Sequence, residues 1–508
     1  MRVAFQLRTF LLAALSSLAA PPTHAEPAAV FKAGFAERDI TPEIGSEIPG
    51  GYGKAYHRSL HDLCKVRAVV FDDGRNRVAL AGIDALFIHR DTVRHVRQAI
   101  ARKTGLAESA ILIGASHSHS SGPMSGVMPG EYDHASKLVQ TLAAKKTICA
   151  DPKYLQKVEQ AIVEAVCQAH DSRVDARAGV GKGVEKTVAF NRRFKMRDGR
   201  TVTHPGQGNP NIVEPAGPTD PEVGVIGVWD SKNKFLGCVV NFACHATTSP
   251  GGISANYIYY LENVIKGYYG KEAVSVFLNG ASGDVTQVDN QSPYRHPTGE
   301  RWAQRVGGKV GAEALKVLLT MEPGTLTPVA SRTKLLTIKR RVPSPERVQQ
   351  CLEMVQKEPA KGNTTEWTFA KEIVLLDAKL KKEPAVEVEV QAVQVGPAVF
   401  LTTPAEYFCR FGLEQKARSG FPFTFPVSLA NGCVGYVPTE DAFGPSGGGY
   451  ETRLTSYSNL EITAGSQMRD AGLELAKGLT PGVVPMPPKP NPFSGQPWSY
   501  GNNKPEVK

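Results

Sequence analysis

The sequence predicts one large mixed α/β domain, because apolar runs of strand length recur along the chain and segments with helical periodicity lie between them. The runs are nearly continuous, which is typical of strands buried on both faces. A chain of 508 residues with 41% hydrophobic content can bury a core of that size. Five such runs lie at 78–83, 111–115, 238–243, 274–278 and 398–401.

The remaining elements follow from local patterns. A short strand closing on a turn is expected at 34–42, and a hairpin at 67–71 and 78–83, because Asp-Gly at 73–74 supports a tight turn. Apolar residues at helical spacing predict packing helices at 92–103 and 154–170. A further helix is expected at 371–382, and alternation predicts a half-exposed strand at 386–394.

The two ends of the chain differ from the domain between them. Arg2 and Arg8 precede the apolar stretch 10–15, and Thr23-His24-Ala25 offers small residues for cleavage, so residues 1–25 are predicted to be a signal peptide. That stretch is shorter than the ~20 residues of a membrane helix. The domain is expected to span 26–480, followed by a Pro-rich, extended tail at 481–508. We therefore predict a secreted or periplasmic protein.

Charge and cysteine content limit the partners. The net charge of +10 is spread along the chain, and the tight cluster Lys339-Arg340-Arg341 is more typical of a solvated face than of a nucleic-acid site. The charge favours peripheral contact with an anionic membrane, which salt would screen. Eight cysteines permit disulfides in an exported protein, and the absence of a Cys-x-x-Cys pair argues against a zinc knuckle. The oligomeric state stays open.

Each of the five apolar runs ends in a cluster of polar or reactive residues. In α/β folds, sites gather at the carboxyl ends of strands, so these exits are expected to share one cleft. In an extended chain, residues two apart point to the same side, as His117 and His119 would. The five clusters contain Asp84; His117 and His119; His245; the segment 279–286; and Glu406.

Several of these residues are of the types that bind divalent metals. His117, His119, His245 and Glu406 offer nitrogen and oxygen donors, and two histidines with a carboxylate and an open position form a hydrolytic zinc arrangement. A His-x-His alone is weaker evidence, because histidines also serve as hydrogen-bonded polar groups at strand ends. The separation of these residues along the chain leaves the ligand set open at this point.

Nine short motifs in a fixed order carry a resemblance to a known family. They resemble the motifs of the neutral ceramidases, secreted or membrane-facing zinc amidases that split the N-acyl bond of ceramide. The motifs stand at 34–42 with 50–52, 61–68, 116–123, 191–193, 241–247, 254–260, 283–286, 404–407, and 435–441 with 450–451.

The resemblance implies a ligand set and several catalytic roles. His117, His245, Glu406 and Tyr436 would ligate one Zn²⁺ per chain, and His119 would lie beside it as a substrate partner or acid/base. Arg192 and Tyr450 would hold the developing oxyanion, with a structural hydrogen bond as the alternative for each. Zinc would polarise the amide carbonyl.

Two departures from the family pattern affect the expected activity. Thr286 stands where the family has its catalytic serine, and its extra methyl group restricts rotamers and crowds attack. Thr286 would be the nucleophile, or would only bind substrate while water attacks; Ser282 is a weaker substitute. The family also carries an immunoglobulin-like domain after the catalytic one, whereas only the Pro-rich tail follows Gly478, so no such domain is expected.

These observations predict an exported zinc-dependent amidohydrolase that cleaves the N-acyl amide bond of a ceramide-like lipid. Two alternatives remain. The same site could hydrolyse another amide or an ester, or the protein could be a catalytically silent homologue that binds a lipid or amide.

Overall fold

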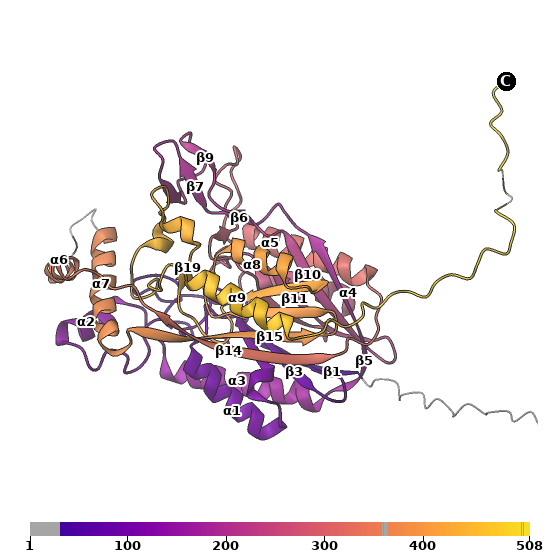
Figure 1. The fold of residues 1–508 in the computed structure, drawn as a ribbon, viewed down its shortest axis with the longest axis horizontal. Helices are drawn as coiled ribbons and strands as arrows, with labels where there is room; N and C mark the ends of the chain where they lie inside the picture. Colours follow the sequence, from indigo (N-terminus) through magenta and orange to yellow (C-terminus); the bar gives the residue numbers. More distant parts are fainter. Residues whose placement is uncertain (1–30, 358, 360–363, 499, 501) are drawn as a thin grey trace, which may run out of the picture.

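Two β-sheets packed face to face form the centre of the molecule, with helices on both outer faces (Figure 1). The computed structural model describes residues 31–357, 359, 364–498, 500 and 502–508, so the predicted signal peptide lies outside the described residues. The larger sheet has eight strands in the order β12-β11-β10-β5-β1-β2-β3-β4. These are β1 (Lys32–Asp39), β2 (Lys65–Asp72), β3 (Arg77–Ile83), β4 (Ile111–Ala115), β5 (Val174–Val184), β10 (Glu222–Asp230), β11 (Phe235–Phe242) and β12 (Val274–Asn279).

The smaller sheet supplies the other half of the central core. Its order is β14-β15-β16-β18, formed by β14 (Val329–Lys339), β15 (Ala385–Val395), β16 (Ala398–Thr403) and β18 (Phe423–Ser428). Leu80 and Val276 of the larger sheet belong to the same buried cluster as Val393, Phe400 and Val427 of the smaller one. The near-continuous apolar runs are thus explained by burial on both faces.

Three pairs of helices cover the outer faces. α1 (Arg90–Thr104) and α3 (Pro152–Asp171) pack on the β1–β4 part of the larger sheet, and α4 (Tyr257–Tyr269) and α5 (Gly299–Thr320) pack on its β10–β12 part. α8 (Cys409–Arg418) and α9 (Ala464–Lys477) cover the smaller sheet. The mixed α/β class predicted from the sequence is confirmed, with the layers ordered α, β, β, α.

Three more helices form a separate small core at one end of the sheets. α2 (Lys137–Lys146), α6 (Pro345–Val355) and α7 (Thr364–Lys382) share a buried cluster, and they lie together in Figure 1. α7 begins seven residues before the predicted start at 371, and its middle is buried all round. This end of the molecule supplies one wall of the cavity described below.

Short ladders and 3₁₀ turns complete the fold around the site. The ladders are β6 (Phe190–Asn191) with β13 (Val285–Thr286), β7 (Arg193–Met196) with β8 (Thr201–Thr203) and β9 (Ile212–Pro215), and β17 (Glu406–Tyr407) with β19 (Tyr436–Val437). The 3₁₀ turns are η1 (Glu108–Ala110), η2 (Glu440–Phe443) and η3 (Tyr450–Thr452).

The predicted hairpin and strand exits can be followed in the sheets. β2 and β3 pair antiparallel around Gly74, whose φ of 82° suits glycine, and Asp72 accepts a hydrogen bond from its backbone N–H. β3 pairs parallel with β4, β11 with β12, and β16 with β18. Parallel neighbours end at the same edge, so their exits are brought together.

The predicted C-terminal tail and the eight cysteines can both be located in the structure. Gly482 donates a backbone hydrogen bond to Gly396, and the described residues beyond Met486 are exposed and extend away from the domain without helix or strand (Figure 1). All eight cysteines are free thiols. Among the described helices, none combines the length and apolar character required to cross a membrane.

Candidate metal centre and active site

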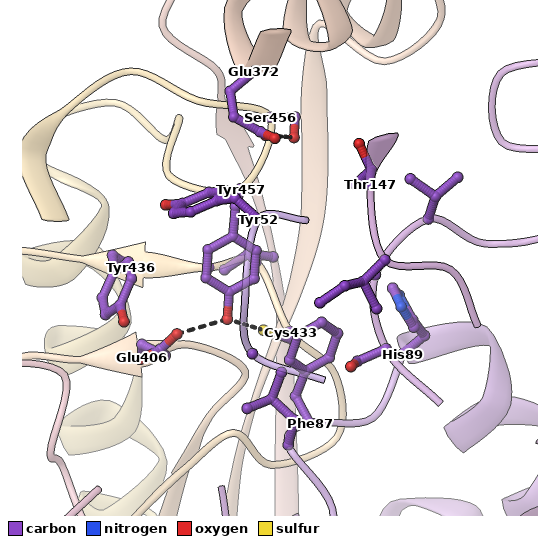
Figure 2. A pocket seen from close by; sticks show the side chains of 18 of the residues that line it. Tyr52, Phe87, His89, Thr147, Glu372, Glu406, Cys433, Tyr436, Ser456 and Tyr457 are labelled. Carbon is purple, nitrogen blue, oxygen red and sulfur yellow. Dashed lines mark hydrogen bonds between the residues drawn. The ribbon is translucent and has the colours of Figure 1, made fainter. Parts of the chain in front are cut away.

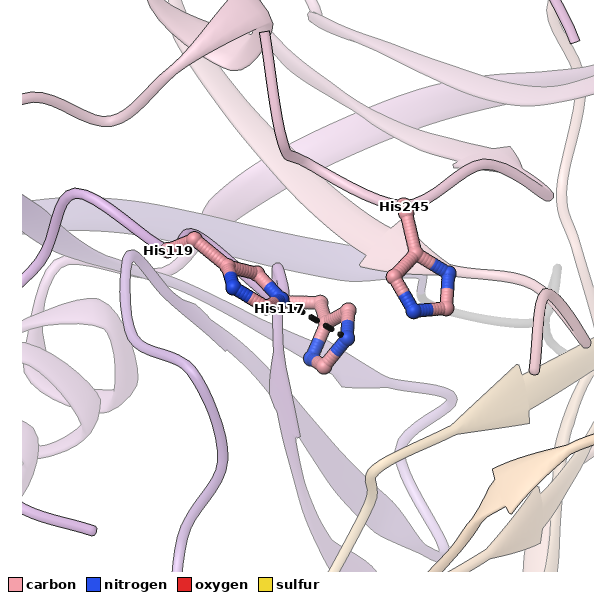
Figure 3. Close-up of side chains that lie close together, drawn as sticks. All are labelled: His117, His119 and His245. Atoms are coloured by element: carbon pink, nitrogen blue, oxygen red, sulfur yellow. Dashed lines mark hydrogen bonds between the residues drawn. The ribbon is translucent and has the colours of Figure 1, made fainter. Parts of the chain in front are cut away.

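Three histidine side chains from two strand exits converge in the interior (Figure 3). His117 and His119 follow β4, and His245 follows β11; their ligand nitrogens all lie within 4.8 Å of one another. The Nε2 atoms of His117 and His119 are 3.3 Å apart. His117 has a φ of 64°, a strained value for a residue with a side chain, and such strain gathers at functional sites.

A buried carboxylate from a third strand exit joins the histidines. Glu406 begins β17 just after β16, and its Oε2 lies 3.1 Å from His117 Nε2 and 3.0 Å from His245 Nε2. Its Oε1 accepts a hydrogen bond of 2.8 Å from the Tyr457 hydroxyl. Burial raises the pKa of Glu406, but the adjacent His117 and His245 outweigh it and hold that pKa well below its usual range. Glu406 is therefore an ionised acceptor.

The tautomers of the two histidines decide what this group can bind. Nδ1 of His117 lies 3.0 Å from the Leu86 carbonyl, and Nδ1 of His245 lies 2.8 Å from that of Ser282. A carbonyl only accepts, so both Nδ1 atoms carry a proton, and both Nε2 atoms face Glu406. Burial and Arg192 lower the pKa of His245 to about 3, which keeps its ring neutral. Two imidazole nitrogens and one carboxylate oxygen that face one another could hold a cation, and two nitrogens with one carboxylate fit zinc.

Two tyrosines border the cluster. The parallel ladder of β17 with β19 places Tyr436 directly beside Glu406, and the Tyr436 and Tyr450 hydroxyls are 2.6 Å apart. Burial, followed by the charge of Glu406, raises the pKa of Tyr436 well above its ordinary value. The structure thus brings Tyr436 to the carboxylate ligand candidate, with Tyr450 as its hydrogen-bond partner.

Arg192 is held by three hydrogen bonds behind His245. Its guanidinium donates to Glu451 at 2.8 Å, to the Gly283 carbonyl at 2.7 Å and to His245 Nε2 at 3.1 Å. Its charge centre also lies 5.3 Å from the Tyr436 ring and 5.0 Å from the Tyr450 ring. Arg192 therefore joins the histidines to the tyrosines, and the bond to His245 is the one that a metal on Nε2 would displace.

Thr286 lies next to the site, but its hydroxyl group takes part in a local hydrogen bond. It is buried on β13, beside Val285, whose carbonyl is 3.1 Å from His245 Nδ1. Its hydroxyl oxygen accepts a hydrogen bond of 3.3 Å from the backbone N–H of Val288. Thr286 is not among the residues that line the cavity in the described part of the chain.

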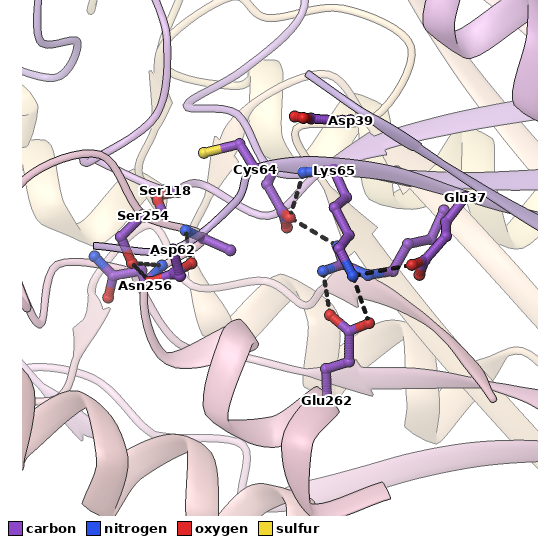
Figure 4. Close-up of polar contacts among 12 residues, drawn as sticks. Glu37, Asp39, Asp62, Cys64, Lys65, Ser118, Ser254, Asn256 and Glu262 are labelled. Atoms are coloured by element: carbon purple, nitrogen blue, oxygen red, sulfur yellow. Dashed lines mark hydrogen bonds and ion pairs between the residues drawn. The ribbon is translucent and has the colours of Figure 1, made fainter. Parts of the chain in front are cut away.

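A polar network ties the histidine-bearing loops together (Figure 4). Asp62 accepts hydrogen bonds from the Ala255 N–H at 2.8 Å and from the Ser254 hydroxyl. Ser118, between the two histidines of the first exit, donates to the Ser254 carbonyl at 2.8 Å. Asn256 adopts a φ of 65° and accepts from the Thr248 N–H at 3.0 Å. The loops after β4 and β11 are thereby held in one arrangement.

One residue predicted at a strand exit, Asp84, does not join the histidine cluster. Asp84 follows β3, but its carboxylate accepts from the Lys65 N–H at 2.8 Å and from Arg67 at 2.7 Å. Arg67 also pairs with Glu262 of α4 at 2.5 Å. The expectation that all five exits share one cleft is wrong for Asp84, because a buried arginine on the adjacent strand β2 captures its charge.

A cavity of about 420 Å³ opens beside the cluster. His119 and Tyr450 line it, together with Glu406, Tyr436, Tyr457 and Phe87, and Figure 2 shows the last four around the pocket. Gly50 packs so closely that a Cβ there would lie 2.2 Å from His119 Nδ1. Tyr457 and the Leu86 carbonyl were not predicted from the sequence, since a lone tyrosine in a loop and a backbone oxygen carry no local pattern.

Comparisons with known proteins agree with the fold. No family model matches the sequence, and no curated protein matches it. The crystal structure of neutral ceramidase from Pseudomonas aeruginosa superimposes with a TM-score of 0.66 at 17% identity, covering 91% of this chain and 77% of that one. A ceramidase structure complexed with C2 gives 0.64 at 16% identity, covering 90% and 77%. The chain thus has the fold of the neutral ceramidases, the family that its motifs resemble.

Proposed function

We propose that the protein is an exported zinc-dependent amidohydrolase that cleaves the N-acyl amide bond of a ceramide-like lipid. The observation that carries the proposal is the convergence of two imidazole Nε2 atoms on one oxygen of Glu406, at 3.0 and 3.1 Å. Buried acceptors in this arrangement call for a cation. The fold shared with neutral ceramidase structures supports the choice of an amide as substrate.

The proposed metal site holds one Zn²⁺ per chain on His117, His245, Glu406 and Tyr436. Zinc supplies Lewis-acid polarisation of an amide carbonyl and acidification of water at neutral pH. Leu86 and Ser282 orient the two imidazoles, and Tyr457 orients the carboxylate through its second oxygen. Such outer partners fix the ligands before metal arrives.

The remaining polar groups are assigned to the substrate. His119 lines the cavity next to the ligands and is placed to exchange a hydrogen bond or proton with the leaving amine. Tyr450 and Arg192 provide donors for negative charge on the carbonyl oxygen. In hydrolysis the C–N bond breaks, the acyl carbon gains the hydroxyl of water, and the amine gains the proton.

Two roles can be assigned to Thr286, and they predict different activities for its variants. Its bond from Val288 and its place outside the cavity lining favour a role in holding the β13 turn behind His245, with water as the attacking group. On that assignment Thr286→Ala lowers activity only modestly and Thr286→Ser changes little. Loss of all activity in Thr286→Ala, with zinc content intact, would instead identify Thr286 as the nucleophile.

Metal content and hydrolysis test the proposal together. We expect one zinc per purified chain, and hydrolysis of fluorescent N-acyl sphingosines in a panel with N-acyl amino acids and simple esters. His117→Ala and His245→Ala should remove both zinc and activity, whereas His95→Ala, on the exposed face of α1, should keep both. A wild-type protein that binds no stoichiometric zinc would refute the metal assignment.

The panel also separates the alternatives. Faster cleavage of esters or of non-lipid amides would identify a zinc hydrolase with another substrate. Zinc binding and lipid binding without turnover of any compound would identify a catalytically silent homologue. Export and contact with anionic membranes are tested separately, by the N-terminus of the mature protein and by salt-sensitive binding to phosphatidylglycerol vesicles.

A further inference from the structure

The cavity reaches well beyond the metal cluster, toward the helical end of the molecule. Glu131, Tyr132 and Thr147 flank α2, and Glu372 and Lys379 come from α7; all five line it. Figure 2 shows Glu372 with Ser456 on one side of the pocket and Glu406 on another, with His89 and Thr147 on a third. A substrate with its amide at Glu406 would therefore extend one arm toward this second wall.

Two uncharged buried polar atoms in the wall lack a hydrogen-bond partner within the described part of the chain, as does Oε1 of Glu372, which has only its ion pair with Lys371. The two uncharged atoms are the hydroxyl oxygen of Ser125, a residue only 1% exposed, and Nε2 of His89. Burial lowers the pKa of His89 to about 4, so both groups are uncharged near neutral pH. A buried polar atom without a hydrogen bond costs about 1–3 kcal/mol, and a hydrocarbon chain in the cavity would leave that cost in place.

The charged groups of the same wall compensate one another. Glu131 pairs with Lys379 at 3.0 Å and also accepts from the Met128 N–H, while Glu372 pairs with Lys371 at 3.1 Å and accepts from the Ser456 hydroxyl. Each carboxylate thus has its own ammonium group. A wall with paired charges and free neutral polar atoms suits an uncharged group that donates and accepts hydrogen bonds.

We propose that the substrate arm seated against this wall ends in an uncharged hydroxyl or amide group, recognised by Ser125 and His89, rather than in a plain hydrocarbon tail. The inference rests on the proposed amidase function and specifies its substrate class. Ser125 and His89 are specificity-determining residues in this assignment, since they contact the arm and not the reacting bond.

Matched substrates test the arm chemistry directly. Each pair replaces a terminal methyl by a hydroxyl: butanoyl against 3-hydroxypropanoyl and octanoyl against 7-hydroxyheptanoyl amides of one fluorescent amine, and N-propyl against N-(2-hydroxyethyl) amides of one fluorescent acid. We expect kcat/KM to favour the hydroxylated member at least about 10-fold in one or more pairs. Equal rates in every pair, or a preference for the methyl members, would overturn the inference.

Single substitutions test whether Ser125 in the wall causes the preference for hydroxylated substrates. Ser125→Ala should reduce the preference about 5-fold or more while rates on the methyl members hold. Ser428→Ala is the matched control, because its hydroxyl is equally buried and unpartnered but lies outside the cavity lining. An unchanged preference in Ser125→Ala, or an equal loss in Ser428→Ala, would contradict the assignment.

Binding distinguishes a failure of this inference from a failure of the proposed function. If no amide is cleaved, the amidase proposal fails, and thermal shifts of the zinc-treated protein with the same amides still test the wall. Greater stabilisation by the hydroxylated members would support recognition at Ser125 and His89. Equal stabilisation would overturn it.

Discussion

Two buried groups of charged side chains in this domain differ in how their charges are matched. Around Arg67, the carboxylates of Asp84 and Glu262 face the guanidinium, and Lys65 and Lys266 add further donors. Around Glu406, one carboxylate oxygen faces the Nε2 atoms of His117 and His245. In the first group each carboxylate is paired with a cation, whereas in the second the nearby guanidinium of Arg192 donates to His245 and Glu451 and, among the described residues, forms no hydrogen bond with Glu406.

The difference shows how a structural cluster is told apart from a binding site. Both groups are nearly free of solvent contact, and both hold carboxylates in low dielectric. Burial raises the pKa of Asp84 to about 6 even beside Arg67, while Glu262, paired with Arg67 and two lysines, keeps a depressed pKa despite its burial. Burial alone therefore carries no functional meaning; the distinguishing feature is that the Glu406 carboxylate faces two histidines, whereas Asp84 and Glu262 pair with Arg67.

Removing the cation of the complete cluster should have the largest effect on stability. Arg67→Met leaves Asp84 and Glu262 buried without their main partner, and we expect the free energy of unfolding to fall by about 3–5 kcal/mol. Urea denaturation of the zinc-treated protein measures this. The additional changes Asp84→Leu and Glu262→Met should recover most of the loss; no recovery would mean that the arginine acts through packing.

The metal cluster should respond in the opposite sense. Glu406→Gln removes the charge of a proposed ligand, and we expect zinc to be lost and kcat/KM to fall about a thousand-fold. The same change gives a neighbouring histidine a donor, so the metal-free variant should melt at a higher temperature than the metal-free wild type. Equal melting temperatures for the two would argue against facing lone pairs.

Removal of zinc should lower the melting temperature of the protein only when the histidine cluster is intact. With free zinc at about 100 times its Kd, binding to the native state adds about 2.7 kcal/mol. Treatment of the wild type with a chelator should reverse this, and zinc addition should restore the melting temperature. In His245→Ala, calorimetry should show a melting temperature that zinc leaves unchanged; a retained shift would place the metal elsewhere.

The smallest expected effect concerns the network that supports the loops. Asp62→Asn weakens the hydrogen bonds to Ser254 and Ala255, and we expect zinc affinity to fall about 10-fold, near the lower limit for outer partners of metal ligands. Competition with a fluorescent chelator measures this. Asp72→Asn, in the β2–β3 turn, is the control and should leave zinc affinity unchanged.

The sequence predicted those parts of the fold that depend on local patterns. Period and turn chemistry located the hairpin, the helices and the strand exits, and the exits of β4, β11 and β16 do meet. The ion pair of Asp84 was not predicted, because it depends on a buried arginine seventeen residues earlier in the chain. The cavity wall from α2 and α7 and the contact of Tyr457 with Glu406 arise from long-range packing, which one sequence does not reveal.

The two-residue ladder of β17 with β19 makes the geometry of the site depend on the correct strand register. It pairs Glu406 with Tyr436, and a slip of one residue would turn one of the two side chains to the opposite face. Chains whose last third has folded in the wrong register would then lack part of the proposed ligand set. The amount of zinc bound per chain, measured after removal of free metal, would then report the fraction of correctly folded molecules before any substrate is known.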